Sequence, residues 1–212
     1  MQSTGTAVQR PAVLADLVPG TLVRDVALVI SAALLTALCA QIAIPLSFSP
    51  VPITGQTFAV LLTAAALGPL RGVAGQGLYV LLGLVGLPFY SEGESGVDVI
   101  LGATGGYLIG FVVAAWVVGV CAQRGLDRSP ARALAVFTLG SAVIFAFGVP
   151  WLAVVAGLGP AEAIALGLLP FIPGGIVKAL LAAGLLPAAW RLVGDERGRP
   201  RDGGGPDREE AH

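Results

Sequence analysis

Apolar stretches close to the length of a bilayer crossing follow one another along this sequence. A transmembrane helix needs about 20 predominantly apolar residues. The stretches cover residues 25–44, 57–68 with Gln56 and its flank, 72–88, 104–122, 133–157 and 164–190. The segment SFSPVPITGQ, with two prolines and a glycine, predicts an irregular connection between the first two. We therefore predict an all-α integral membrane protein, folded as a bundle of six transmembrane helices.

Composition agrees with a bilayer as the solvent. Hydrophobic residues make up 56% of the chain and charged residues 12%, whereas a soluble domain usually has about a quarter of its residues charged. Residues 1–24 lack the compact apolar core and small-residue cleavage site of a signal peptide, so we interpret them as a cytoplasmic N-terminal leader. The membrane domain is expected over residues 25–192. Residues 193–212 are charged and glycine-rich, and we expect a disordered cytoplasmic tail.

The arginines predict the orientation of these spans. With the N-terminus in the cytoplasm, every arginine falls in the leader, in a cytoplasmic loop or after the sixth span. The outer loops carry no arginine and contain Glu92, Glu94, Asp98 and Glu162 instead. An excess of basic residues on the cytoplasmic side is the usual signature of membrane topology. We predict a multi-pass protein of the cytoplasmic membrane with both termini inside.

Several chemistries are disfavoured by the residues that the chain lacks. Its single histidine, His212, is the last residue, which argues against a Ser–His–Asp hydrolase and a histidine metal site. No G-x-x-x-x-G-K-[ST] motif is present for ATP, and apart from Asp25 at the first position of the first span no carboxylate lies in a predicted span to relay protons. Cys39 and Cys121 lie in apolar runs and are expected to pack. We predict a protein that is not an enzyme, uses no cofactor or metal and binds no nucleic acid.

Lys178 is the only lysine in the chain, and it lies in the apolar segment FIPGGIVKALLAAGLL. A charge near the centre of a membrane helix costs about 2.5 kcal/mol or more. One interpretation is that Lys178 reaches the outer headgroups or bonds to backbone carbonyls. The other is an outward-facing pocket, where the ammonium meets an anionic or carbonyl-bearing ligand. The proline–glycine break at residues 173–175 favours the pocket, because irregular backbone at membrane depth usually lines a cavity.

Other polar and aromatic residues are expected at the same level. Gln56 begins the second span, and Thr104 and Tyr107 begin the fourth. Aromatic residues at the outer ends of spans are ordinarily interface anchors, with ligand contact as the alternative. Tyr79 lies deeper, where core packing is the favoured interpretation. The candidate substrate-binding residues are Lys178, Gln56, Tyr107, Thr104, Phe48, Phe171 and Tyr79.

Ala33 and Ala37 lie four residues apart on one face of the first span. Small residues with this spacing let helix backbones approach closely in lipid. They predict either close packing inside the bundle or a docking face for another membrane protein.

Four segments together resemble the BioY family, the biotin-binding substrate-capture (S) components of energy-coupling factor transporters. They are FSPVPITGQTFAVLL (48–62), YVLLGLVGLPFY (79–90), GATGGYLIGF (102–111) and FIPGGIVKALLA (171–182). The resemblance covers about residues 25–190. It implies the six-helix S-component fold in a bacterial cytoplasmic membrane, with biotin bound near the outer face. It also implies a transmembrane coupling protein, contacted by Ala33 and Ala37, and two cytoplasmic ATPases as partners.

The sequence departs from the family pattern in the sixth span. That pattern resembles F-I-P-G-Asp-x-x-Lys, with both charged residues helping to hold biotin, whereas here Gly175 stands at the aspartate position. We hypothesise that the ligand's carboxylate or ureido carbonyl holds Lys178, while amides or backbone groups accept the ureido N–H groups. Two alternatives stay open: another small vitamin-like ligand, and a membrane scaffold protein without a ligand.

Overall fold

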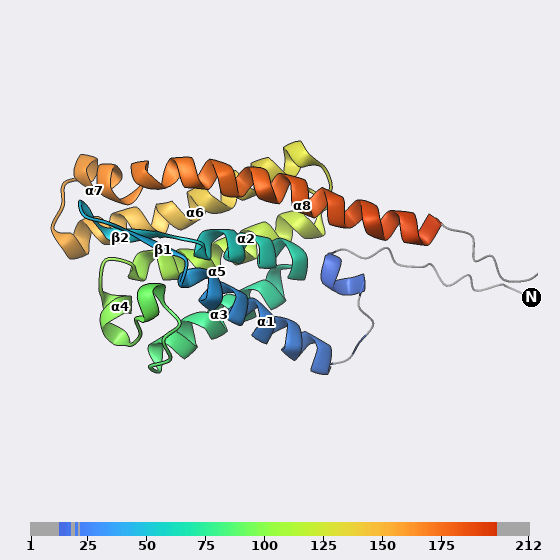
Figure 1. Cartoon of the computed structure of the whole chain (residues 1–212), viewed down its shortest axis with the longest axis horizontal. Helices are drawn as coiled ribbons and strands as arrows, with labels where there is room; N and C mark the ends of the chain where they lie inside the picture. The colour runs from blue at the N-terminus through green and yellow to red at the C-terminus, as the bar shows by residue number, and fades with distance from the viewer. Residues whose placement is uncertain (1–12, 18–19, 21, 199–212) are drawn as a thin grey trace, which may run out of the picture.

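The computed structural model describes residues 13–17, 20 and 22–198, which are mostly helical. The longer helices are α1 (Leu22–Ala40), α2 (Gln56–Leu67), α3 (Pro69–Leu84), α5 (Gly105–Gln123), α6 (Pro130–Ala156) and α8 (Ile172–Gly198). Two short helices are α4 (Val97–Leu101) and α7 (Pro160–Gly167), and 3-10 turns cover Leu14–Leu17, Ser91–Gly93 and Leu169–Phe171. Figure 1 shows a β-hairpin, α4 and α7 gathered at the end of the molecule away from the C-terminus of α8.

Each of the six predicted stretches overlaps one of these longer helices. By length and hydropathy, four of the described helical segments are able to cross a membrane: Leu22–Ala40, Gly105–Gln123, Pro130–Ala156 and Pro160–Leu192. Helix α2 is apolar but has only 12 residues. The structure therefore supports a helical protein with several membrane spans. Most of the predicted leader and tail lies outside the described residues.

The predicted first span and the connection after it were wrong in detail. Helix α1 ends at Ala40, and residues 43–54 form an antiparallel hairpin of β1 (Ala43–Leu46) and β2 (Ser49–Thr54). Pro45 cannot donate the backbone hydrogen bond that a continuing helix needs. Prolines are tolerated in a two-stranded ribbon because each strand has one unpaired edge.

The predicted sixth span is interrupted rather than continuous. Helix α7 ends at Gly167, and the turn Leu169–Phe171 separates it from α8. Pro170 lies in that turn, where a continuous α-helix would lose a backbone hydrogen bond. Phe171, at the end of this turn, packs against the core.

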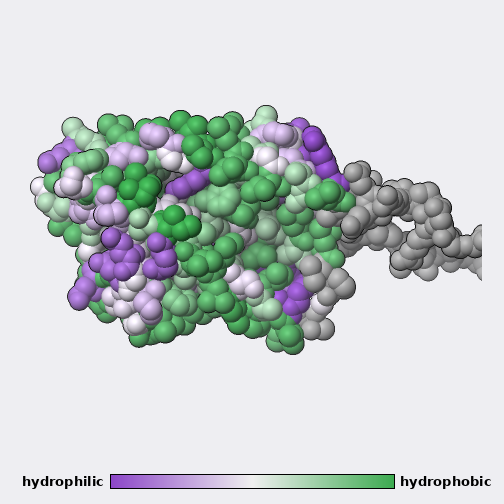
Figure 2. All heavy atoms as spheres, in the orientation of Figure 1, coloured by the Kyte–Doolittle hydropathy of each residue, from purple (hydrophilic) through white to green (hydrophobic). Residues whose placement is uncertain are grey.

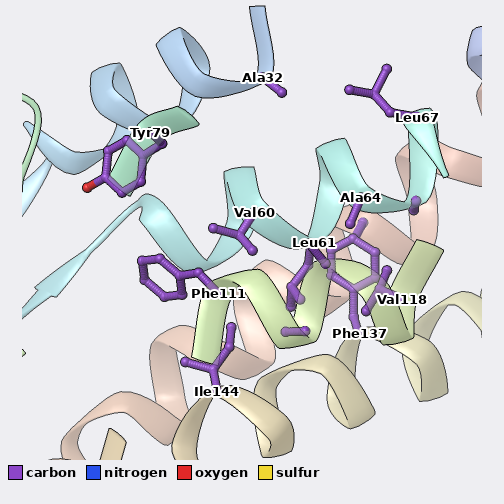
Figure 3. Packing of buried hydrophobic residues seen from close by; sticks show 14 of the residues in the cluster. Ala32, Val60, Leu61, Ala64, Leu67, Tyr79, Phe111, Val118, Phe137 and Ile144 are labelled. Atoms are coloured by element: carbon purple, nitrogen blue, oxygen red, sulfur yellow. The ribbon is translucent and has the colours of Figure 1, made fainter. Parts of the chain in front are cut away.

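Helix α5 lies at the centre of the bundle and packs against α2, α3 and α6. Glycines on α5 permit very close approach: a Cβ at Gly119 would lie 2.4 Å from the Pro69 nitrogen. Apolar side chains of α2, α5 and α6 converge in the core (Figure 3), among them Val60, Leu61, Phe111, Val118, Phe137 and Ile144. In lipid, close packing of this kind replaces the hydrophobic drive that holds soluble bundles together.

Ala33 and Ala37 lie on the buried face of α1, with 0% and 8% of their surface exposed. This helix packs against α3 and α2. A Cβ at Gly75 of α3 would lie 2.8 Å from the Cβ of the neighbouring Ala32, so the contact is tight. The structure therefore favours close packing inside the bundle and leaves neither alanine accessible to a partner.

The outer surface is largely apolar. Figure 2 shows hydrophobic residues over most of the visible face, with hydrophilic residues mainly toward the two ends of the long axis. Large apolar side chains are exposed on α1, α6 and α8, including Leu34, Leu38, Leu139, Phe147, Leu180 and Leu185. A surface of this kind is expected where lipid, rather than water, surrounds the helices.

Candidate ligand-binding site

A cavity of about 120 Å³ lies beside the hairpin and the ends of α2, α5 and α8. Apolar side chains form much of its wall, and polar groups are spaced around it. Its lining comprises Pro50, Val51, Pro52, Thr54, Gln56, Thr57, Tyr90, Ser91, Glu92, Glu94, Val99, Thr104, Tyr107, Leu108, Phe111, Phe145, Phe171 and Lys178. Mostly apolar walls with a few fixed polar groups are typical of small-molecule sites.

Lys178 is held in this cavity by neutral oxygen atoms. Its Nζ donates to the backbone carbonyl of Thr54 at 2.6 Å and to Oγ1 of Thr57 at 2.8 Å. Within the described part of the chain, no carboxylate forms an ion pair with it. An ammonium has three N–H donors, so the third is available to a ligand. Both sequence interpretations contain part of the answer: the lysine bonds to a backbone carbonyl and also lines a pocket.

Both the oxygen and the nitrogen of the Gln56 side-chain amide are hydrogen-bonded to neighbouring residues. Its Oε1 accepts a hydrogen bond from Thr54 Oγ1 at 2.7 Å, and its Nε2 donates to the Tyr79 hydroxyl. Gln56 lines the cavity, while Tyr79 is fully buried behind it and does not. Tyr79 is therefore placed to orient Gln56 instead of meeting a ligand directly.

Tyr107 belongs to an aromatic wall. Its ring centroid lies 6.2 Å from that of Phe145 and 6.4 Å from that of Phe171. Its hydroxyl donates to the backbone carbonyl of Gly167 at 2.8 Å, which links α5 to the end of α7. Thr104 lies directly before α5, and its hydroxyl makes a long 3.4 Å contact with the Val99 carbonyl.

Phe48 does not join these residues. It lies between the two strands of the hairpin, is 59% exposed and does not line the cavity. The other candidates on the cavity wall are Lys178, Gln56, Tyr107, Thr104 and Phe171.

Comparison with known proteins places this architecture in a family. The profile of the BioY family matches residues 7–195. The chain belongs to the BioY family. It is 38% identical to the biotin transporter BioY of Rhizobium etli over 168 residues, 76% of this chain and 89% of that protein. It is 41% identical to the biotin transporter BioY of Rhodobacter capsulatus over 170 residues, 74% of this chain and 88% of that protein.

A solved structure agrees with the BioY assignment. The fold is similar to the 2.1 Å crystal structure of the S-component for biotin from an ECF-type ABC transporter, with a TM-score of 0.70. The match covers 82% of this chain and 95% of that one, at 25% sequence identity. The architecture is therefore that of a BioY-type S component.

Sequence reasoning did not assign several wall residues in this BioY-family chain. Thr57, Phe145 and two glutamates, Glu92 and Glu94, line the cavity. The glutamates were recognised only as outer-loop charges, because no local pattern shows that the segment after α3 folds back over the cavity. Thr57 could have been proposed as a wall residue from the sequence, because it directly follows Gln56 at the start of a predicted span.

Tyr90 is a further wall residue that the sequence did not assign. It is 1% exposed, and its hydroxyl donates to the Val80 carbonyl at 2.7 Å. Burial raises the pKa of Tyr90 to about 12. Its phenol is therefore neutral at physiological pH and anchors the segment after α3 to that helix.

Gly175, expected from the resemblance to replace an aspartate, faces open space. A Cβ built there would meet nothing within 4 Å. A small second cavity beside it is lined in part by Thr57, Ser141, Phe145 and Lys178. The lack of a side chain at Gly175 therefore leaves room next to the lysine that none of the described residues fills.

Proposed function

We propose that this chain captures biotin from outside the cytoplasmic membrane and takes it up as the substrate-binding component of an energy-coupling factor transporter. The observation that supports this most directly is the cavity that contains Lys178 in a chain of the BioY family. Relatives that bear the name biotin transporter match about three quarters of this chain, 76% and 74% in the two comparisons.

The chemistry of the wall suits biotin. Its fused rings and aliphatic chain would pack on Phe111, Phe145 and Phe171, while the free N–H of Lys178 donates to a ligand oxygen. The Gln56 amide and the Thr104 hydroxyl supply further polar contacts. Binding of this kind needs no reaction, which agrees with our inference that the chain is not an enzyme.

The membrane arrangement follows from the arginines and the fold. We infer that all six longer helices cross the bilayer and that both termini are cytoplasmic, with residues 1–24 and 193–212 flanking a 25–192 membrane domain. In this orientation the hairpin, α4 and α7 lie on the outer side, so the cavity opens to the outside. The loop with Arg124, Arg128 and Arg132 then faces the cytoplasm.

Energy for uptake would come from partners. The sequence has no phosphate-binding loop of its own, so we propose that a transmembrane coupling protein and two cytoplasmic ATPases complete the transporter. The buried positions of Ala33 and Ala37 mean that a coupling protein would meet other residues of α1 unless the helix shifts.

A second candidate is an S component for another vitamin-like ligand. The open space at Gly175 favours it, because the cavity lacks a carboxylate on α8 that would accept ligand N–H groups. Competition between labelled biotin and other vitamins would separate these two candidates.

The test is equilibrium binding of labelled biotin to the purified protein in detergent, with Lys178→Ala and Arg191→Ala variants. The second variant removes a positive charge from an exposed residue outside the cavity. We expect saturable binding by the wild type and the Arg191 variant, and a large loss in the Lys178 variant. No saturable binding by the wild type would exclude biotin and leave another vitamin or a ligand-free scaffold.

A further inference from the structure

The cavity is electrically asymmetric. Lys178 is the only basic side chain among the described residues of its wall. Glu92 and Glu94, from the segment between α3 and α4, line the same cavity and are exposed to solvent. Across the described ranges, neither glutamate forms an ion pair with a basic side chain. Two uncompensated carboxylates therefore stand at the rim of a site whose cation lies on α8.

The rim segment is anchored to the bundle. Tyr90 N donates to the Glu94 carbonyl at 3.1 Å, and Gly96 N donates to the Gly83 carbonyl of α3 at 2.8 Å. The side chain of Gln41 reaches the Tyr90 carbonyl at 3.1 Å. The two carboxylates are thus carried by a fixed backbone.

Ser91 adds an unpaired hydroxyl group to the same wall. It lines the cavity between Tyr90 and Glu92, and only 8% of its surface is exposed. Its hydroxyl oxygen is buried without a hydrogen-bond partner in the described structure. Buried polar groups are normally paired, so a ligand group that reaches this part of the wall would satisfy it.

The aromatic side chains indicate which end of a biotin-like ligand lies where. Phe145, Phe171 and Lys178 line both the main cavity and the small one beside Gly175, so they are neighbours. The fused rings are the widest apolar part of biotin and pack best on this aromatic wall. With the rings there, the ureido carbonyl would reach Lys178 and the aliphatic chain would run toward the solvent-exposed glutamates of the same cavity.

We propose that Glu92 and Glu94 select ligands by the charge of the ligand group that lies beside them, an inference that rests on the proposed function. They disfavour a carboxylate there and accept a neutral or cationic group. The ligand class is therefore biotin joined through its carboxyl group as an amide, the form in which biotin is attached to lysine. Free biotin binds in the same orientation but places its carboxylate beside two others.

The expected effect follows from Coulomb's law. Two unit charges about 6 Å apart in water change an affinity about threefold, so two carboxylates acting together change it up to about tenfold. The effect weakens as salt is added, because the rim is exposed.

The experiment measures the affinities of three probes for the purified protein: biotin, biotinamide and N-(2-aminoethyl)biotinamide. The variants are Glu92→Gln/Glu94→Gln and a control, Asp98→Asn/Glu162→Gln. The control removes the same charge from outer residues that do not line the cavity.

We expect the wild type to bind the cationic amide at least as tightly as biotin. In the rim variant the ratio of biotin affinity to biotinamide affinity should rise about 3- to 10-fold, while the control keeps the wild-type ratio. An equal ratio in wild type and rim variant would overturn the proposal, as would tight binding of biotin with no binding of either amide. Failure of the proposed function would look different, because the wild type would then bind none of the three probes.

Discussion

At the scale of single residues, Lys178 shows how a lone charge is accommodated inside an apolar bundle. The carbonyl of Thr54 and the hydroxyl of Thr57 each accept a hydrogen bond from its ammonium group. These partners come from the end of β2 and the start of α2, far from Lys178 in the sequence. Hydrogen bonds to charged groups contribute about 1.5–3 kcal/mol, so they offset part of the cost of burying the ammonium.

The Thr57 hydroxyl can be removed with little change in the size of the side chain. Thr57→Val deletes one acceptor of Lys178, so the ammonium loses its position toward the ligand. We expect biotin affinity to fall about 10-fold, the equivalent of about 1.4 kcal/mol, measured by equilibrium binding. Thr138→Val is the matched control, because the Thr138 hydroxyl bonds to the Leu134 carbonyl on an exposed part of α6. An unchanged affinity for Thr57→Val would show that this hydroxyl does not position the lysine.

Gly175 allows the opposite test, because a substitution there adds a polar group near Lys178. Gly175→Asp places a carboxylate three residues before Lys178, on the same helix face, in space that is now open. We expect about 10-fold tighter biotin binding, because a carboxylate accepts N–H groups more strongly than a neutral wall. Isothermal titration compares it with Gly175→Asn, which has similar size and no charge. Weaker binding by the aspartate variant than by the asparagine variant would contradict this expectation.

At the scale of secondary-structure elements, α7 is tied to the site by two hydrogen bonds. Ser49 of β2 donates to the Leu166 carbonyl at 2.9 Å, and Tyr107 of α5 donates to the Gly167 carbonyl at 2.8 Å. These bonds join the hairpin, α5 and α7 across the outer end of the bundle. The elements around the cavity are therefore mechanically connected.

Tyr107→Phe tests this connection. The ring stays in the aromatic wall, while the Gly167 carbonyl loses its partner from α5. We expect a loss of about 1 kcal/mol in stability and a faster release of biotin, seen in thermal unfolding and in dissociation after dilution. A variant with unchanged melting temperature and release rate would show that α7 is held by its other contacts.

The sequence predicted elements well where one physical signal dominated. Long apolar runs identified the positions of the longer helices, because lipid requires backbone hydrogen bonds to be satisfied within each span. The hairpin was missed because the prolines and glycine of SFSPVPITGQ indicate only an irregular connection, and the pairing of the two strands with each other decides the structure. The break at residues 168–171 was missed for a similar reason: Pro170 signals an interruption, but the apolar run continues through it.

At the scale of the whole molecule, the site was less predictable than the fold. Lys178 was chosen as the lone lysine of an apolar segment, and the others because they lie near the outer ends of predicted spans. The residues that the structure brings to one cavity are Lys178, Gln56, Thr104, Tyr107 and Phe171. Phe48 met the same criterion but lies in the exposed turn of the hairpin. The role of each wall residue in binding remains a prediction for the experiments above.

The end of the molecule opposite the cavity has its own buried charge. Asp127, in the loop between α5 and α6, is fully buried and accepts a hydrogen bond from Trp190 Nε1 of α8 at 2.7 Å. Its other carboxylate oxygen has no partner among the described residues. Burial raises the pKa of Asp127 above its ordinary value of 3.8.

The raised pKa of Asp127 makes the stability of the fold depend on pH in a definite direction. Between the unfolded and the folded pKa, the folded state binds more protons, so the contribution of Asp127 to stability falls as pH rises through that window. Asp127→Asn keeps an oxygen for Trp190 and removes the charge. We expect it to be more stable than the wild type at pH 7, with the difference shrinking as pH is lowered toward 4. Melting temperatures across this range provide the measurement, and a variant that is less stable at pH 7 would contradict it.

The hydrogen bonds of Lys178 also bear on a complete transport cycle. A carrier must return empty after it has delivered its cargo, and a bare ammonium would be the most expensive part of that return. Here two oxygen atoms of the protein bond directly to the charge. We expect these bonds to lower the cost of carrying the lysine through the empty return, and so the barrier to resetting the carrier for another round.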